Sequence, residues 1–204
     1  MLRTIAFWTA VIGSVGLVLL IVVGAAAWPG YSHVRDFISE LGATGAPQGR
    51  LVSLGGFLAV GVCLTAFCAA AALVAPRSRL RYAGFACLGL FGLGYMAIAF
   101  FRCDFGCPPT SPSLSQTLHS LTSLAGYVGA PVGMVLLGLS ARRWPGAAGL
   151  FPLGLVTAAI AAAGFLGMLV ESPVGGLVQR LVEGSILVWI VACAFAIRRE
   201  PATA

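Results

Sequence analysis

The residues of this chain best suited to acid–base chemistry are two glutamates, an aspartate and a histidine. They are Glu40, Asp104, His119 and Glu183. A histidine or a carboxylate serves as a general base or acid, and a set of them can hold a divalent metal ion that activates water. The candidate ligands of such an ion are His33, Glu40, Asp104 and His119. Their nitrogen and oxygen atoms suit zinc or manganese, although the sequence holds no HxxxH, HExxH or His-x-His pair.

A second group of polar residues is suited to binding a ligand. Its members are His33, Ser39, Arg50, Arg102 and Gln179. Arginine binds phosphate or carboxylate groups through two parallel hydrogen bonds, so arginines near a membrane surface suit the headgroup of a lipid or another small amphiphile. Gln179 precedes Glu183 by four residues, which places both on one helical face.

The composition places these residues in a membrane protein. Of the 204 residues, 59% are hydrophobic and 9% are charged, whereas soluble domains have about 25% charged residues. The 18 charged side chains (12 basic and 6 acidic) are too few to coat a soluble domain of this size. The basic residues are all arginines in short clusters between apolar runs, which argues against a nucleic-acid partner despite the net charge of +6.

Six apolar stretches are long enough to cross about 30 Å of hydrocarbon at about 1.5 Å per residue. The predicted spans are Ile5–Ala27, Leu51–Ala75, Tyr82–Phe101, Leu114–Ser140, Ala147–Val170 and Leu177–Ile197. Helix is the expected state, because open sheet edges leave backbone polar groups unsatisfied in lipid. The first stretch also fits a signal peptide, but its apolar run is longer than the usual 7–15 or so residues. We therefore predict an all-α fold, one six-transmembrane-helix bundle over residues 1–204 that contacts the lipid bilayer.

The arginines predict the orientation. With the N-terminus inside, eight arginines fall on the cytoplasmic side and four on the outer side. Both termini are therefore expected in the cytoplasm, with the bundle in the plasma or inner membrane. Seven of the eight Asp, Glu and His residues then lie at the outer side, and the exception is Glu200. Since acidic residues contribute little to orientation, this cluster is a candidate site.

The first outer loop, Tyr31–Gly42, predicts a short amphipathic helix. Its apolar residues recur at helical spacing and are Val34, Phe37, Ile38 and Leu41. Another face carries His33, Asp36 and Glu40. Such a helix either lies at the interface with a solvated polar face or lies on, or is tucked into, the outer mouth of the bundle.

The third connection, Phe101–Pro109, holds Cys103 and Cys107 four residues apart. Outside the membrane, this pair indicates a local disulfide that fixes the turn containing Asp104. A redox-active dithiol is the alternative, which CxxxC spacing indicates only weakly. The other four cysteines lie in apolar spans and are expected to be inert packing residues.

His119 shares one face of the fourth span with three small residues, Ser115, Thr122 and Gly126. The pattern indicates a wet, inward-facing stripe. The alternative is a histidine at headgroup level that is hydrogen-bonded to a neighbour.

Glu183 is about six residues into the sixth span, or about 9 Å deep. A carboxylate at this depth should face protein or water and not lipid. Either it pairs with Arg180 or Arg102, or it binds a proton or a ligand; we favour the second interpretation.

Several of these motifs resemble one family. They are Tyr31-Ser32-His33, Ile38-Ser39-Glu40-Leu41-Gly42, an aspartate after the third span and a histidine opening the fourth. Together they resemble the bacterial and archaeal membrane proteins grouped as domain of unknown function 998, over essentially the whole chain. Members commonly have Pro-Thr-Asp where this chain has Arg102-Cys103-Asp104, which suggests a subgroup whose turn is held by a disulfide. The resemblance implies the architecture, implies no activity, and marks Glu40, Asp104 and His119 as positions of interest.

Three functions are compatible with these features. The first, which we favour, is binding or handling of a lipid or another small amphiphile in an outward-facing pocket of histidine and carboxylates. The second is a hydrolase or transferase acting on a lipid headgroup, with His119 or a carboxylate as general base and a divalent metal ion as one variant. The third is a proton-coupled transporter that uses Glu183 and His119 as relay groups. Six helices without an evident repeat make alternating access hard to build.

Overall fold

The computed structural model describes residues 1–107 and 111–199. Within those residues it consists of helices and loops, with no strand. Six segments are long and apolar enough to cross a membrane, namely α1 (Leu2–Ala26), Gly49–Val74, α4 (Arg79–Phe100), α5 (Leu114–Ala141), α6 (Leu150–Met168) and α7 (Gly175–Arg199). The second segment joins α2 (Gly49–Leu51), a π-helical stretch (Val52–Phe57) and α3 (Leu58–Val74). The predicted bundle of six membrane-spanning helices is confirmed; Glu200 lies outside the described residues.

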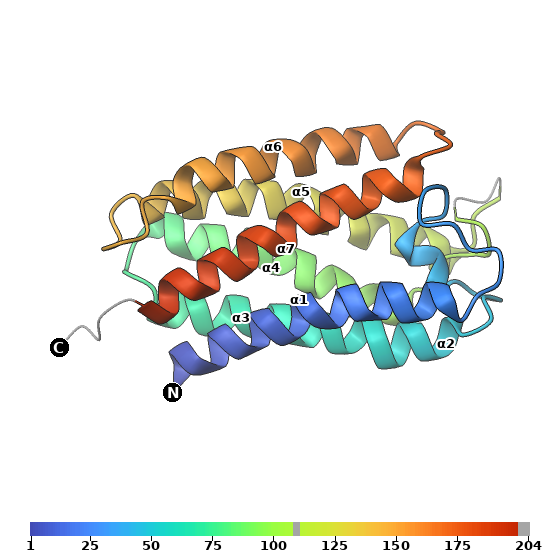
Figure 1. The fold of residues 1–204 in the computed structure, drawn as a ribbon, viewed down its shortest axis with the longest axis horizontal. Coiled ribbons are helices and arrows are strands. Elements are labelled where there is room, and N and C mark those ends of the chain that lie inside the picture. Colours follow the sequence, from blue (N-terminus) through green and yellow to red (C-terminus); the bar gives the residue numbers. More distant parts are fainter. Residues whose placement is uncertain (108–110, 200–204) are drawn as a thin grey trace.

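The helices lie alongside one another, and the connections gather at the two ends of the bundle (Figure 1). One end, called the loop end, carries residues 27–48, 101–107 and 169–174. The other carries the start of α1, the last turn of α7 and the connections 75–78 and 142–149. It is called the arginine end, because eight of the twelve arginines lie there.

The outer surface of the helices is apolar. Val23 on α1, Leu73 on α3 and Val188 on α7 are each more than half exposed in the isolated chain. Large apolar patches on a protein surface normally contact lipid or a partner. Together with the six apolar helices, this surface makes the chain a multi-pass membrane protein.

Glycines bring the backbones of α4 and α5 into contact. A Cβ atom added at Gly133 would lie 2.7 Å from the carbonyl oxygen of Gly84, and one at Gly129 would lie 2.5 Å from that of Cys87. Small residues permit this approach in lipid, where helices gain little from the hydrophobic effect. The contact fixes α4 against α5 in the half of the bundle toward the arginine end.

The first outer loop is mostly turn rather than helix. The helix predicted over Tyr31–Gly42 is observed only as a 3₁₀ helix, η1 (Ile38–Gly42). Upstream, the Ser32 hydroxyl accepts hydrogen bonds from two following backbone N–H groups, and the Asp36 carboxylate accepts one from the Ser32 N–H at 2.6 Å. Such local bonds compete with helix formation. His33 therefore lies in a turn and not on a helical face.

Candidate ligand-binding site

A cavity of about 330 Å³ lies inside the loop end. Helices α4, α5, α6 and α7 form its walls together with the first outer loop. Most of the wall is apolar and includes Phe57, Phe91, Ile98, Leu124, Phe165 and Met168. A few polar side chains converge on the same space, among them Ser39, His119, Ser123, Tyr127, Gln179 and Glu183. An apolar hollow with a few convergent polar groups is the usual form of a small-molecule site.

A chain of hydrogen bonds crosses the polar wall of this cavity. The backbone N–H of Ile38 donates to Gln179 Oε1 at 2.5 Å, and Gln179 Nε2 donates to the Tyr127 hydroxyl at 2.9 Å. Tyr127 donates in turn to Glu183 Oε1 at 2.7 Å. All four residues are buried. This series of hydrogen bonds orders side chains of α5 and α7 and connects them to η1.

Glu183 has no cationic partner among the described residues. Its side chain is 2% exposed, and its Oε2 makes no hydrogen bond within that part of the chain, although Tyr95 contributes to its polar surroundings. The alternative of an ion pair with Arg180 or Arg102 is wrong. Arg180 donates to the Tyr31 hydroxyl at 2.6 Å, and Arg102 donates to two backbone carbonyls of the first outer loop. Glu183 faces protein and the cavity, as predicted from its depth.

His119 lies buried in the cavity wall. Its Nδ1 is hydrogen-bonded to the backbone carbonyl of Phe101 at 3.0 Å. Because a carbonyl only accepts, Nδ1 carries the hydrogen, and the neutral ring keeps Nε2 as an acceptor. Both interpretations of His119 hold in part, since it is bonded to a neighbour and also borders a hollow.

Two residues of the predicted stripe on α5, His119 and Gly126, line the cavity, and the other two do not. Ser115 donates to the carbonyl of Arg102 and Thr122 donates to carbonyls of its own helix, and neither lines the cavity. The residues of α5 that do are Gln116, His119, Ser120, Ser123, Leu124, Gly126 and Tyr127. Four of these carry a hydroxyl or an amide at spacings of four, three and four residues: Gln116, Ser120, Ser123 and Tyr127. That spacing is helical and was the sequence signal for the residues that the prediction missed.

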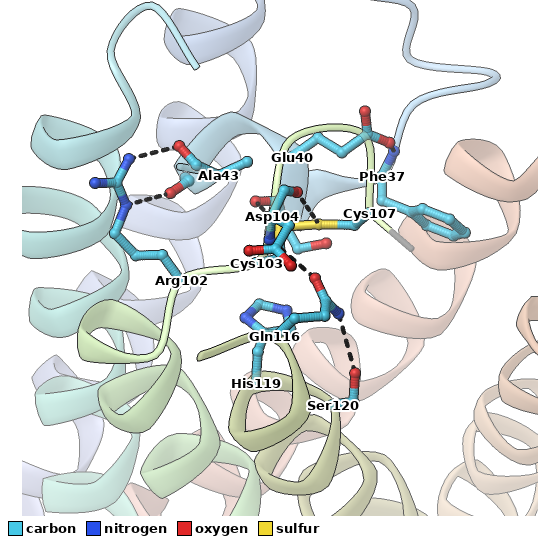
Figure 2. Close-up of a disulfide and its surroundings, with 12 residues drawn as sticks. Phe37, Glu40, Ala43, Arg102, Cys103, Asp104, Cys107, Gln116, His119 and Ser120 are labelled. Carbon is cyan, nitrogen blue, oxygen red and sulfur yellow. Dashed lines mark hydrogen bonds between the residues drawn. A yellow bond between two sulfur atoms is a disulfide. The ribbon is translucent and has the colours of Figure 1, made fainter. Parts of the chain in front are cut away.

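Glu40 stabilises the first outer loop. Its Oε1 accepts a hydrogen bond from the backbone N–H of Phe37 at 2.9 Å (Figure 2). Burial raises the pKa of Glu40 above its ordinary value, and the bond from Phe37 opposes that shift. Glu40 does not line the cavity, and Figure 2 shows its carboxylate well apart from the His119 ring.

Asp104 stabilises the start of α5. Its carboxylate accepts hydrogen bonds from the backbone N–H and the hydroxyl of Ser113, the residue that caps this helix, at 2.9 and 2.8 Å. These bonds hold the pKa of Asp104 below its ordinary value. The backbone N–H of Asp104 donates to Gln116 Oε1 at 2.9 Å and so positions a residue of the cavity wall.

Four residues of the predicted site line the cavity: Ser39, His119, Gln179 and Glu183. Five do not: His33, Glu40, Arg50, Arg102 and Asp104. Arg50 is exposed, whereas Arg102 donates to the carbonyls of Gly42 and Ala43, the first at 2.8 Å (Figure 2). The predicted metal ligands are not brought together either. Within residues 1–107 and 111–199, no group of three His, Cys, Asp or Glu side chains could hold a metal ion.

Cys103 and Cys107 form the predicted disulfide (Figure 2). Cys107 lines the cavity, and the backbone carbonyl of Cys103 accepts the N–H of Thr44 at 2.8 Å. The disulfide loop is thereby joined to the first outer loop, and the two together cover the cavity. The remaining cysteines are free and lie within α3, α4 and α7.

The fold and the cavity define a six-helix membrane protein with a mostly apolar hollow, lined in part by polar side chains, at its loop end. The chain belongs to the family described as protein of unknown function DUF998, which matches residues 11–196. The resemblance found in the sequence motifs is confirmed, and it covers every helix that borders the cavity. No curated protein and no solved structure matches this chain.

Proposed function

We propose that this protein binds a lipid or another small amphiphile in the cavity at the loop end. The observation that supports this is the division of the cavity wall. Apolar side chains cover most of it, and the hydrogen-bonded residues Gln179, Tyr127 and Glu183 give it polar groups, as does His119. An amphiphile has the same division, an apolar part that gains by leaving water and a polar part that needs hydrogen bonds. The cavity of about 330 Å³ falls within the roughly 300–1,000 Å³ of small-molecule sites.

The polar group of the ligand is expected to donate a hydrogen bond to Glu183. An unpaired polar atom in a buried site costs about 1–3 kcal/mol, and Glu183 Oε2 is such an atom among the described residues. His119 Nε2 is a second acceptor at the same wall. Arg102, which the sequence suggested as a headgroup ligand, holds the loops instead, as does Arg180. A hydroxyl or an ammonium group therefore suits this wall better than a phosphate.

Exposed apolar side chains at the edge of the cavity suggest how a ligand enters. Leu124 on α5 is 45% exposed and Leu169, just after α6, is 67% exposed, and both line the cavity. Exposed leucines on a membrane-spanning bundle contact lipid tails. Entry from the bilayer, sideways past these two leucines, is part of the proposal.

Binding is favoured over hydrolysis because two of the four predicted acid–base residues form hydrogen bonds outside the cavity. Glu40 and Asp104 hydrogen-bond the loops and lie outside the cavity. His119 and Glu183 remain at the wall, where they offer acceptors to a ligand.

A cavity-filling substitution tests the proposal. Ser123 lines the cavity from α5, whereas Ala125 is exposed on the same helix and does not line it. Native mass spectrometry of protein titrated with decylamine or decanol should show binding by the wild type and by Ala125→Trp. Ser123→Trp should lose it, because the indole occupies the space. Methyl decanoate, which has no donor, should bind at least about tenfold more weakly than decanol. Equal binding by the two tryptophan variants would contradict the proposed site.

We also propose that the arginine end faces the cytoplasm from a plasma or inner membrane. Eight arginines at that end against four at the loop end support this orientation. The cavity then lies near the outer leaflet.

A further inference from the structure

A second hollow lies at the arginine end, between the connection from α3 to α4 and the end of α5. Its volume is about 500 Å³. The residues that matter to its chemistry are Arg77, Ser78, Ser140, Arg142 and Arg143. None of them belongs to the cavity at the loop end, so this hollow is a separate candidate site.

Three guanidinium groups border this hollow, and no carboxylate lines it. Among the described residues, one ion pair is present, and it joins Arg35 to Asp36 at the loop end. The three arginines therefore have no counterion within that part of the chain. Like charges held close together favour the binding of an anion between them. The tendency of arginines to lie on the cytoplasmic side explains their presence at this end, but it does not explain their convergence on a hollow.

A pair of serine hydroxyls in the same wall provides an independent observation. Ser78 Oγ and Ser140 Oγ lie 2.8 Å apart, and Ser78 Oγ also accepts the backbone N–H of Arg81 at the start of α4. The two hydroxyls carry two hydrogens, and the bond between them uses one. The other hydrogen has no acceptor among the described residues, although Ser140 is only 4% exposed. The serine pair can therefore donate one hydrogen bond to a ligand in the hollow that accepts it.

Two further features hold positive charge in place at this hollow. The Arg142 guanidinium lies over the Phe151 ring, 5.1 Å from its centroid, which restricts the side chain. The 22-residue helix α4 begins at the hollow, and the N-terminal end of a helix carries partial positive charge.

We propose that this hollow binds the phosphate group of an anionic lipid. A phosphate supplies a counterion for the three arginines. Its oxygen atoms also accept the hydrogen bond that the serine pair can donate. Free phosphate shares that chemistry, but Leu80 and Leu139 also line the hollow and give acyl chains a surface that free phosphate would not use. The hollow lies where the helices end, the depth at which headgroups meet basic pockets.

The test measures affinity of the full-length protein in a neutral detergent for three probes. They are dioctanoyl phosphatidic acid, dioctanoyl phosphatidylcholine and inorganic phosphate. The hollow is altered in the double variant Arg142→Gln/Arg143→Gln. The matched control is Arg198→Gln/Arg199→Gln, which removes the same charge from the same end but from residues that do not line the hollow. Because the two variants lose equal charge, any difference in affinity between them must come from the residues that line the hollow.

The wild type and the control variant should bind phosphatidic acid with similar affinity, and Arg142→Gln/Arg143→Gln should bind it at least about tenfold more weakly. Phosphatidylcholine and inorganic phosphate should bind the wild type at least about tenfold more weakly than phosphatidic acid. Equal loss in the two double variants would overturn the site, and equal affinity for inorganic phosphate would overturn its assignment to a lipid.

Ser140→Ala keeps the result interpretable if the arginine variant fails to fold. It removes one hydroxyl of the pair and no charge, and it should weaken phosphatidic acid binding about fivefold. Unchanged affinity in Ser140→Ala would overturn the role of the serine pair and, with it, the argument for an acceptor ligand.

Discussion

The Tyr127 hydroxyl donates to Glu183 Oε1 at 2.7 Å and thereby links α5 to α7 inside the bundle. The same hydroxyl accepts from Gln179 Nε2 at 2.9 Å, so its single hydrogen is committed to the carboxylate. Both partners are buried and both line the cavity. This arrangement leaves Glu183 Oε2 without a hydrogen bond among the described residues, and it is the acceptor that we propose for the ligand.

Tyr127→Phe is expected to destabilise the folded protein by about 1–3 kcal/mol, because it leaves Gln179 Nε2 and Glu183 Oε1 without partners in a buried wall. Unfolding in detergent micelles measures the change. Tyr82→Phe, at an exposed tyrosine of α4, is the control and should shift stability by no more than about 0.5 kcal/mol. Similar losses in the two variants would argue against a structural role for the hydroxyl of Tyr127.

Arg102→Ala should loosen the cover of the cavity. The Arg102 guanidinium holds two carbonyls of the first outer loop, and its loss should cost about 1–3 kcal/mol of unfolding free energy. Arg50→Ala removes an exposed arginine beside the same loop and should have an effect within about 0.5 kcal/mol. Limited proteolysis should also cut the loop faster in the Arg102 variant. If both variants resist the protease equally, Arg102 does not hold the loop.

The disulfide should contribute modestly to stability. Joining Cys103 to Cys107 closes a very short loop, for which chain entropy predicts about 2 kcal/mol. The double variant Cys103→Ser/Cys107→Ser should lose about that amount by denaturant unfolding. Alkylation of protein from intact membranes followed by mass spectrometry should modify these two cysteines only after reduction. Modification without a reductant would show that the bond does not form in the cell.

Two carboxylates should affect the pH dependence of stability with opposite sign. Glu40 has a pKa raised above its ordinary 4.5, so its contribution is fully present below that value and is lost as the pH rises through the raised pKa. Asp104 has a pKa lowered below its ordinary 3.8, so its contribution is present above that value and is lost as the pH falls through the lowered pKa. Unfolding midpoints between about pH 3 and 7 measure both effects.

Comparison with neutral variants isolates each group. The advantage of the wild type over Glu40→Gln should shrink as the pH rises from 4.5, whereas its advantage over Asp104→Asn should shrink as the pH falls below 3.8. If both differences change in the same direction, either burial does not raise the pKa of Glu40 or the bonds from Ser113 do not lower that of Asp104.

Single-cysteine variants at the two ends of the bundle test its orientation in the membrane. Val34 is exposed at the loop end and Arg143 at the arginine end. In intact cells, a membrane-impermeant maleimide should label Val34→Cys, and it should label Arg143→Cys only after permeabilisation. The reverse pattern would place the cavity near the inner leaflet. The wild type, whose free cysteines lie within helices, sets the background.

The helices were predictable to within three residues at each end, because long apolar runs leave no other stable state in lipid. The disulfide was predicted because Cys103 and Cys107 lie four residues apart in a loop outside the spans. The burial of Glu183 was predicted from the cost of a charged group in hydrocarbon.

The details of the site depended on contacts that spacing does not encode. The Asp104 carboxylate accepts hydrogen bonds from Ser113, nine residues later in the sequence. The Arg102 guanidinium donates to loop carbonyls about sixty residues earlier. The predicted stripe on α5 was half correct: His119 and Gly126 line the cavity, but Gln116 and Ser123 line it in place of their neighbours Ser115 and Thr122. Periodicity finds a polar face, but only the packing of α5 against α4 and α6 decides which side chains border the cavity.

The bond from the Ile38 N–H to Gln179 has a consequence for exchange of the contents of the cavity. Movement of η1 away from the cavity would break this buried contact, so the bond opposes opening at the loop end. The proposed ligand would then enter and leave through the lipid bilayer. Its residence time in the cavity should depend on acyl-chain length and membrane fluidity rather than on ionic strength.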